Sequence, residues 1–183
     1  MENSSLVFVI QKHAATRLHY DFRLQIGDVM PSWSIPKGPT LDPSMKRLAM
    51  ATTDHDLEYR HFEGKIPEGQ YGAGAVMIWD EGTYIPEIEI SKGKLEKVED
   101  YEEGQKVMQE GLKNGQLKFT LLGKKLQGSF ALVKTRGFGP KNSWLLIKHK
   151  DEFIKPGYDA NSFIRSAFSN RTMEEISAIG NEK

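Results

Sequence analysis

The residues best suited to chemistry lie in one short stretch, residues 11–23, which reads QKHAATRLHYDFR. It holds two histidines, His13 and His19, with Asp21 and Arg23. Two imidazoles and a carboxylate suit a divalent ion such as Mn²⁺, Fe²⁺ or Zn²⁺. An arginine beside them offers a planar pair of donors that matches phosphate or carboxylate. The stretch therefore predicts a metal centre with an oxyanion clamp. The alternative is a polar strand face whose histidines bind nothing.

Positioning these groups requires a strand. Side chains two residues apart share one face of a strand, so His19, Asp21 and Arg23 would point to the same side. The aromatic and aliphatic residues between them would then form a stripe on the opposite, core-facing side. The polar set is therefore expected to face a groove or solvent.

A second polar cluster, DHDLEYRH, spans residues 54–61. His55 and Tyr59 could donate hydrogen bonds to an anion or a proton to a leaving group. His61 is interpreted as a surface residue, and so is His149, which lies between two lysines in a basic stretch. The glycines of residues 67–74 are followed by strand-like residues and no Gly-Lys-Ser/Thr occurs, so they predict a loop rather than a nucleotide-binding motif.

The charge is balanced overall, with 25 basic and 25 acidic residues, but it is unevenly distributed. Residues 80–110, the acidic segment, hold ten acidic residues and four lysines. Residues 111–150, the basic segment, hold nine lysines and arginines and no acidic residue. Such a segment could bind a phosphate backbone, or it could be a solvated face that the acidic segment balances. The candidate nucleic-acid contacts are Lys118, Lys124, Lys125, Lys134, Arg136 and Lys148.

Length and composition are those of one globular domain, residues 1–183, with 38% apolar and 27% charged residues. The absence of a long apolar run argues against a membrane helix, and no secretory signal is visible. Without cysteine the chain has no disulfide, thiol nucleophile or iron–sulfur site. We expect a cytoplasmic protein.

The elements that carry these residues are predicted to be mainly strands. Apolar, β-branched or aromatic runs bounded by Gly, Pro, Asp or Asn indicate strands at residues 6–11, 18–26, 29–35, 47–53, 75–79, 117–122, 128–135 and 144–150. Gly27-Asp28 is a hairpin turn candidate. A helix is predicted at residues 101–114, ended by Gly115, and Thr172 to Glu175 fits a capping box that opens a second one. The pattern predicts a mainly β fold, a compact antiparallel β-barrel or closed sandwich of about eight strands with one or two short peripheral helices.

At this point the sequence resembles a known family. Residues 8–23 (FVIQKHAATRLHYDFR) are similar to the 3′-phosphoesterase module of bacterial ATP-dependent DNA ligase D. Further similar segments follow in order at residues 33–43 (WSIPKGPTLDP), 46–49, 54–59, 62–74 (FEGKIPEGQYGAG), 79–83 and 144–152 (WLLIKHKDE). Residues 52–56 (TTDHD) depart from the usual Val-Glu-Asp-His-Pro but retain His55. The resemblance covers a core of about residues 6–152 and leaves residues 153–183 as a C-terminal extension with a short helix.

The resemblance implies a compact β-barrel with a surface groove and a Mn²⁺-dependent activity, with Zn²⁺ or Co²⁺ as alternative metals. It assigns the metal to His13, His19 and Asp21. It assigns phosphate contacts to Arg23, His55 and Tyr59, with Gln11 as a supporting neighbour. Apart from Gln11, all of these are the expected catalytic residues.

The implied function is a metal-dependent DNA 3′-end-processing phosphoesterase of non-homologous end joining. It would remove a 3′-phosphate, and a 3′-terminal ribonucleoside, from primer ends. The implied partners are DNA or RNA-tailed primer–template ends, with separate ligase, polymerase and Ku proteins; no membrane is involved and a monomer is expected. Family members often carry an upstream arm, and seven residues precede Phe8. We therefore expect phosphate removal to be at least as efficient as ribonucleoside removal.

Two functions of other classes remain open. His19-x-Asp21 with a distal histidine also fits the iron site of a nonheme Fe(II) oxygenase on a β-barrel, in which Arg23 would hold an oxoacid carboxylate. The other is a non-catalytic nucleic-acid-binding barrel that stacks bases on aromatic side chains and binds DNA equally well without metal. The candidates for such stacking are Trp33, Tyr59, Tyr71 and Trp79.

Overall fold

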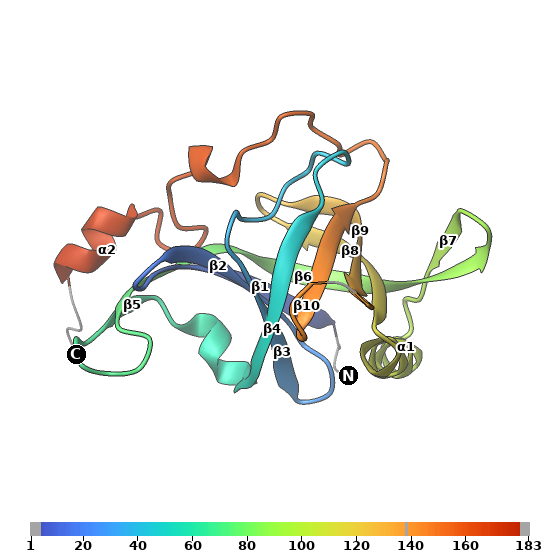
Figure 1. Ribbon diagram of the computed structural model, residues 1–183, viewed down its shortest axis with the longest axis horizontal. Coiled ribbons are helices and arrows are strands. Elements are labelled where there is room, and N and C mark those ends of the chain that lie inside the picture. The colour runs from blue at the N-terminus through green and yellow to red at the C-terminus, as the bar shows by residue number, and fades with distance from the viewer. Residues whose placement is uncertain (1–4, 138, 180–183) are drawn as a thin grey trace.

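The computed structural model describes residues 5–137 and 139–179 (Figure 1). The strands are β1 (Leu6–Ala14), β2 (Leu18–Leu24), β3 (Val29–Ile35), β4 (Arg47–Asp56), β5 (Gly64–Ile66), β6 (Gly74–Ser91), β7 (Lys94–Lys97), β8 (Gln116–Gly123), β9 (Gln127–Lys134) and β10 (Ser143–Lys148). The helices are α1 (Tyr101–Asn114) and α2 (Met173–Ile179), with two short 3₁₀ helices, η1 (Leu57–His61) and η2 (Ala160–Ser162).

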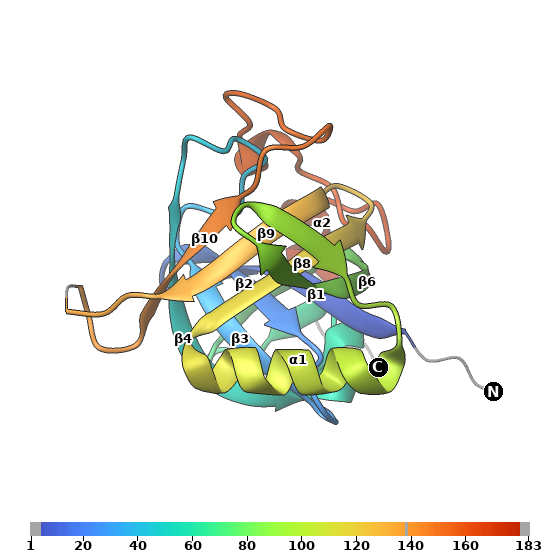
Figure 2. The ribbon, with the colours of Figure 1, turned by 90° about the vertical axis from the view of Figure 1, so that its right-hand side faces the viewer.

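Eight of the strands close into an antiparallel barrel. Their order is β1-β2-β3-β4-β10-β9-β8-β6, and β6 pairs back with β1. The short strands β5 and β7 add to β6 outside this ring. Two helices lie at the periphery: α1 packs on β6 and β8 (Figure 2), and α2 packs on β5 and β6. The predicted mainly β fold, an antiparallel barrel of about eight strands with one or two short helices, is confirmed.

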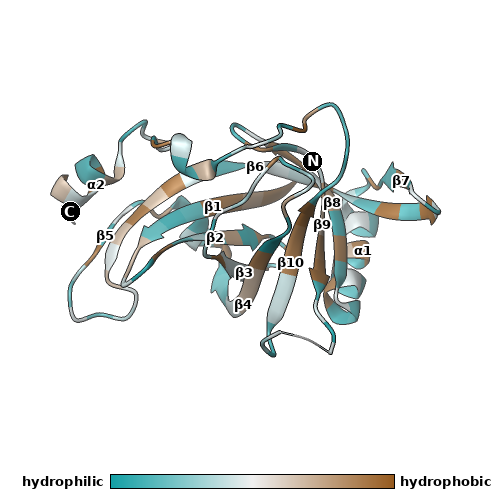
Figure 3. Ribbon diagram, turned by 45° about the horizontal axis from the view of Figure 1, so that its top comes forward, coloured by the Kyte–Doolittle hydropathy of each residue, from teal (hydrophilic) through white to brown (hydrophobic). Residues whose placement is uncertain are grey.

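Alternating side chains of the strands fill the barrel. On β2, Tyr20, Phe22 and Leu24 are almost fully buried and belong to the main core, as the spacing predicts. Phe22 contacts the rings of Trp33 from β3 and Phe119 from β8, so the core joins opposite walls of the barrel. Figure 3 shows hydrophobic residues gathered on strands such as β9 and β10, while the loops are mostly polar.

Local signals set the helix boundaries. Helix α1 ends where Gly115 adopts a left-handed conformation (φ 80°), which glycine reaches without steric cost. The predicted capping box of α2 is present, since Glu175 N donates to Thr172 Oγ1 at 3.2 Å and Thr172 N donates to Glu175 Oε1 at 2.9 Å. Neither α1 nor α2 combines the length and the apolar character needed to cross a membrane.

Strand β6 is far longer than the predicted residues 75–79. It passes a register shift opposite Ile10 and Gln11 and continues beyond the barrel to pair with β7. At the shift, Asp80 accepts the backbone N–H groups of Lys124, Lys125 and Leu126 at 2.8, 2.9 and 2.9 Å. This buried carboxylate thereby holds the β8–β9 turn against β6.

Candidate metal and phosphate site

Strand pairing brings the polar residues of β1 and β2 together. Gln11 lies opposite Asp21, and His13 lies opposite His19. Because Tyr20 and its alternate neighbours point into the core, these side chains point away from it, on the outer face of the barrel. The register of one hairpin therefore assembles the first part of the site.

A pocket of about 980 Å³ lies over this face. The hairpin, the end of β4, η1 and the loop of residues 66–73 contribute to its wall. The lining residues include six of the seven predicted metal- and phosphate-binding residues, namely His13, His19, Asp21, Arg23, His55 and Tyr59. The expected surface groove is thus present where the motif places it.

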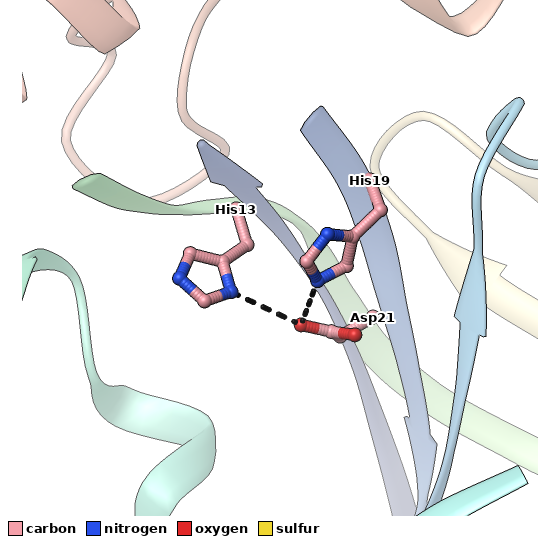
Figure 4. A group of neighbouring side chains, drawn as sticks. All are labelled: His13, His19 and Asp21. Carbon is pink, nitrogen blue, oxygen red and sulfur yellow. Dashed lines mark hydrogen bonds and ion pairs between the residues drawn. The ribbon is translucent and has the colours of Figure 1, made fainter. Parts of the chain in front are cut away.

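Figure 4 shows how His13 from β1 and His19 and Asp21 from β2 point toward one another. Asp21 Oδ2 lies 3.7 Å from His13 Nδ1 and 3.2 Å from His19 Nε2. One ligand atom from each of the three residues lies within 4.8 Å of the others. This spacing allows one ion to contact all three.

Backbone carbonyls fix the orientation of both rings. Gly72 O lies 2.7 Å from His13 Nε2, and Arg17 O lies 3.0 Å from His19 Nδ1. A carbonyl oxygen can only accept, so these ring nitrogens carry protons. The other ring nitrogens face the Asp21 carboxylate, and this contact is attractive when the ring carries a second proton, as the raised pKa of His19 favours, or when a metal ion lies between neutral rings and the carboxylate. A carbonyl behind a histidine is also the usual outer-shell partner of a metal ligand.

The electrostatics of the site agree with a bound cation. Burial favours a raised pKa for Asp21, but hydrogen bonds with His13 and His19 and the charge of Arg23 outweigh it and lower that pKa. The hydrogen bond with Asp21 raises the pKa of His19. The carboxylate thus stays ionised and draws positive charge to this point. The chemistry and orientation of the donors fit a divalent metal.

Arg23 lies at the base of the pocket and is 4% exposed. Its Nε donates to Gln11 Oε1 at 2.6 Å, its Nη1 donates to Ser32 Oγ at 3.0 Å, and its Nη2 lies 3.5 Å from Asp21 Oδ2. Burial lowers the pKa of Arg23 while Asp21 opposes this shift, and a guanidinium remains charged in proteins. A cation is therefore held rigidly beside the three donors.

Gln11 is fully buried and holds this arginine from behind. Its Nε2 donates to Tyr59 O at 2.9 Å and to Phe62 O at 3.1 Å, while its oxygen accepts from Arg23. Gln11 is not among the residues that line the pocket. The Gln11 amide is bonded to the backbone around η1 and to the Arg23 guanidinium, and it does not reach the pocket. Gln11 therefore supports Arg23 rather than contacting a ligand directly.

A β-bulge brings His55 to the site. Ser32 pairs with Thr52, whereas Met30 pairs with His55, so β4 has one residue more than β3 between these pairs. The residue of β3 at this point is Pro31, which has no N–H for the ladder. An extra residue reverses the alternation of side chains beyond it. His55 therefore emerges on the outer face.

His55 and Tyr59 complete the anion side of the pocket. His55 Nδ1 lies 3.1 Å from Arg23 Nη1, and the Arg23 guanidinium lies over the Tyr59 ring at 5.1 Å. Burial and then the charge of Arg23 lower the pKa of His55, and burial raises the pKa of Tyr59. Because arginine can only donate, the contact with Arg23 favours a neutral His55 ring that accepts at Nδ1 and carries its proton on Nε2, whereas Thr53 O, at 3.1 Å from the same Nδ1, favours a proton on that atom.

The outer face of the barrel also carries residues that the sequence did not single out. Ser32 and Ser34 lie opposite Arg23 and Asp21 on β3, so the alternation of β3 could have indicated them. Arg17 and Gly72 orient the histidines through backbone oxygens, which side-chain types do not reveal. His61 and His149 lie outside the described lining of the pocket.

The basic segment lies elsewhere on the barrel, and none of its residues is among those described as lining the pocket. Several of its charges have partners in the chain: Lys118 with Glu89 at 3.9 Å, Lys124 with Glu81 at 3.6 Å, Lys125 with the carbonyls of Trp79 and Arg165, and Arg136 with the carbonyl of Asn114. Lys134 is exposed. The alternative of charge balance by the acidic segment thus accounts for Lys118 and Lys124.

Lys148 requires a correction. Its side chain is 0% exposed, and its ammonium donates to Asp151 Oδ1 at 2.7 Å and to the carbonyls of Ser129 and His149 at 3.2 and 3.0 Å. A buried and fully hydrogen-bonded ammonium cannot contact a nucleic acid at the surface. The predicted nucleic-acid contact at Lys148 is contradicted by this burial.

Comparison with known proteins identifies the family. The model of the DNA ligase D 3′-phosphoesterase domain matches residues 11–134. The chain is 44% identical over 146 residues to the multifunctional non-homologous end joining protein LigD of Pseudomonas aeruginosa, covering 80% of this chain and 15% of that protein. It is 39% identical over 145 residues to the LigD protein of Mycolicibacterium smegmatis, covering 79% and 17%. It is 40% identical over 145 residues to the multifunctional non-homologous end joining DNA repair protein LigD of Mycobacterium tuberculosis, covering 79% and 16%. The chain thus spans a small part of the length of these relatives, and it belongs to the DNA ligase D 3′-phosphoesterase domain family.

Proposed function

We propose that this protein is a metal-dependent phosphoesterase that acts on the 3′ ends of DNA in non-homologous end joining. It removes a 3′-phosphate, and a 3′-terminal ribonucleoside, from primer ends. The observation that carries the proposal is the convergence of His13, His19 and Asp21 beside the buried Arg23 in an open pocket. The family and the names of the relatives support the DNA-repair setting.

His13, His19 and Asp21 would hold the ion, with Mn²⁺ as the first expectation and Zn²⁺ or Co²⁺ as alternatives. When bound, a divalent ion supplies charge neutralisation for a phosphate group. Hydrolysis forms a bond from a water oxygen to phosphorus and breaks the bond from phosphorus to the departing oxygen. On a 3′-phosphate end the products are a 3′-hydroxyl and inorganic phosphate.

Arg23 stabilises the negative charge on the phosphate oxygens. Gln11 and Ser32 hold its guanidinium before substrate binds, so little reorganisation is required during the reaction. The Nε2–H of His55 is the donor that we assign to the departing oxygen, which must gain a proton as the ester bond breaks. Tyr59 keeps its proton, because burial raises its pKa, and donates a hydrogen bond to the phosphate.

The test uses a 5′-labelled primer–template that ends in a 3′-phosphate or a 3′-ribonucleotide, incubated with Mn²⁺ or with EDTA. We expect phosphate release in Mn²⁺ and none in EDTA. Each of His13→Ala, His19→Ala and Asp21→Ala should lower the rate in Mn²⁺ by at least about 100-fold. His61→Ala is the matched control, since His61 is exposed and outside the described pocket lining. Full activity in EDTA would contradict the proposal.

The relatives' names support an end-joining and DNA-repair setting. We propose that the protein acts in the cytoplasm as a monomer on DNA or RNA-tailed primer ends, together with ligase, polymerase and Ku activities. Light scattering of the purified protein tests the monomer, and pull-down with each purified partner tests the contacts.

One alternative shares the metal ligands. Two histidines and one carboxylate also form the iron site of nonheme oxygenases, and the geometry of His13, His19 and Asp21 is compatible with it. Oxygen uptake with Fe²⁺ and a 2-oxoacid would favour this alternative. DNA binding without any hydrolysis in Mn²⁺ would favour a non-catalytic barrel.

A further inference from the structure

One aromatic side chain at the pocket stands out by its exposure. Tyr71 lines the pocket and is nevertheless fully exposed (101%). A phenol ring that remains in water beside a site leaves both its area and its face available to a ligand. A ligand can cover such a ring without breaking a contact within the protein, and a flat ligand can stack on its face.

The loop that carries Tyr71 is fixed to the site. The carbonyl of the next residue, Gly72, lies 2.7 Å from His13 Nε2. Turn hydrogen bonds run from Gln70 N to Pro67 O at 3.2 Å and from Ala73 N to Gln70 O at 3.1 Å. The ring is therefore attached one residue from the contact that orients a candidate metal ligand.

A second rim residue comes from the β1–β2 turn. Arg17 is exposed and lines the pocket, and its carbonyl lies 3.0 Å from His19 Nδ1. Among the described residues of the lining, the permanently cationic side chains are Arg17 and Arg23. Because Arg23 is buried and held by Gln11 and Ser32, Arg17 is the arginine that faces solvent at the mouth.

We propose that Tyr71 and Arg17 form a subsite for the strand end itself, in which Tyr71 stacks on the 3′-terminal nucleobase and Arg17 binds the phosphodiester that precedes it. The inference rests on the proposed function, which places the terminal phosphate beside His13 and His19. The sugar and base must then leave through the mouth of the pocket. The carbonyl that orients His19 belongs to Arg17, and the carbonyl that orients His13 belongs to Gly72, the neighbour of Tyr71. Tyr71 and Arg17 therefore lie beside that exit.

The chemistry of the two groups suits a substrate of any sequence. Stacking on an aromatic ring tolerates every base, because each base has a π-face. An arginine at a phosphodiester likewise reads no sequence. The described pocket lining includes no residue of the basic segment, so Arg17 is its solvent-facing cation available to the strand.

The first experiment pairs removal of the ring with removal of the base. Binding of 3′-phosphorylated oligonucleotides that end in adenine or in an abasic tetrahydrofuran is measured by fluorescence anisotropy in EDTA, where no hydrolysis is expected. Tyr71→Ala should weaken binding of the adenine end by about 5- to 160-fold. The abasic end should weaken binding to the parent protein by a similar factor and show no further loss with Tyr71→Ala.

The matched controls separate stacking from other causes. Tyr71→Phe and Tyr71→Trp should bind the adenine end like the parent, because the flat ring is kept. Phe168→Ala removes an aromatic ring that is 68% exposed and outside the described lining, and should change nothing. Equal losses on adenine and abasic ends, or no loss on either, would overturn the stacking role of Tyr71.

The Arg17 contact is tested by salt. Arg17→Ala should weaken both oligonucleotides equally and lower the slope of log affinity against log salt by about 0.7. Arg171→Ala, at an exposed arginine outside the described lining, is the control. An unchanged slope with Arg17→Ala would overturn this contact. Failure of the proposed function is seen separately, as no phosphate release by the parent protein in Mn²⁺.

Discussion

Replacing Arg23 by lysine separates positive charge from the planar shape of the guanidinium. The parent side chain reaches Gln11, Ser32 and Asp21 with three different nitrogens. A lysine keeps the charge but concentrates it on one atom, which cannot occupy the three positions. We expect Arg23→Lys to remain folded and to lose most of its activity.

The expected cost in stability comes mainly from one group. Gln11 Oε1 accepts from Arg23 Nε at 2.6 Å inside a fully buried side chain. Leaving such an acceptor without a donor costs about 1–3 kcal/mol. The Ser32 hydroxyl also donates to Met30 O at 2.9 Å and keeps that bond. A loss of this size is below the stability of a typical domain, about 5–15 kcal/mol.

The expected cost in activity is larger than this loss of stability can explain. Removing one positioned donor from a developing negative charge lowers kcat by about 10²–10³. The assay is single-turnover release of phosphate from a 3′-phosphorylated primer at saturating Mn²⁺. Urea unfolding gives the stability, and calorimetric titration gives the affinity for Mn²⁺, which should be kept. Arg171→Lys is the exposed control.

Two results would refute this reasoning in different ways. Turnover equal to that of the parent would show that Arg23 does not clamp phosphate through its planar face. A large loss of Mn²⁺ affinity would instead show that Arg23 acts on the metal ligands, through its contact of 3.5 Å with Asp21.

The remaining predictions concern backbone, protonation and charge. Gly74→Ala should lower the free energy of unfolding by at least about 1–3 kcal/mol, because φ is +127° and the added Cβ would lie 2.0 Å from a backbone oxygen of β1. In the urea assay that checks this, Gly69→Ala has no atom within 4 Å of the added Cβ and should cost less. The pKa of His55, followed by NMR, should lie below its ordinary value of about 6.5 and rise in Arg23→Gln, since burial and Arg23 lower it. Because the unfolded chain then binds the proton first, His55 should reduce stability as pH falls below about 6.5, and a raised pKa would contradict this. Lys148→Met should cost about 2–4 kcal/mol and leave the salt slope of DNA binding unchanged; a lower slope would restore Lys148 as a DNA contact.

Alternation and termination signals are enough to predict most of the barrel. The strand at residues 29–35 and the helix at residues 101–114 have the predicted bounds, because a run of alternating residues and Gly115 mark their ends. The excess length of β6 was not predictable, since its continuation depends on pairing with β7 and β8. Local patterns identify an element, whereas partners far away in sequence decide how long it extends.

The basic segment shows where charge patterns fail. Its sequence contains no acidic residue, yet Lys118 and Lys124 meet Glu89 and Glu81 of the acidic segment in the folded barrel. Burial of Lys148 depends on Asp151, which lies just beyond the segment. A sequence gives the order of charges along the chain but not their neighbours across strands, so a charge run alone does not indicate a binding face.

The candidate site was predictable on the hairpin and much less so beyond it. His13, His19 and Asp21 meet because pairing and alternation in one hairpin place them on one face, and both rules can be applied to the sequence. His55 needs an extra residue in β4 before it turns to the same face. A strand without this bulge would direct His55 toward the barrel interior. The bulge therefore joins the anion side of the pocket to the metal side, and it explains why His55 could be assigned from resemblance but not from alternation.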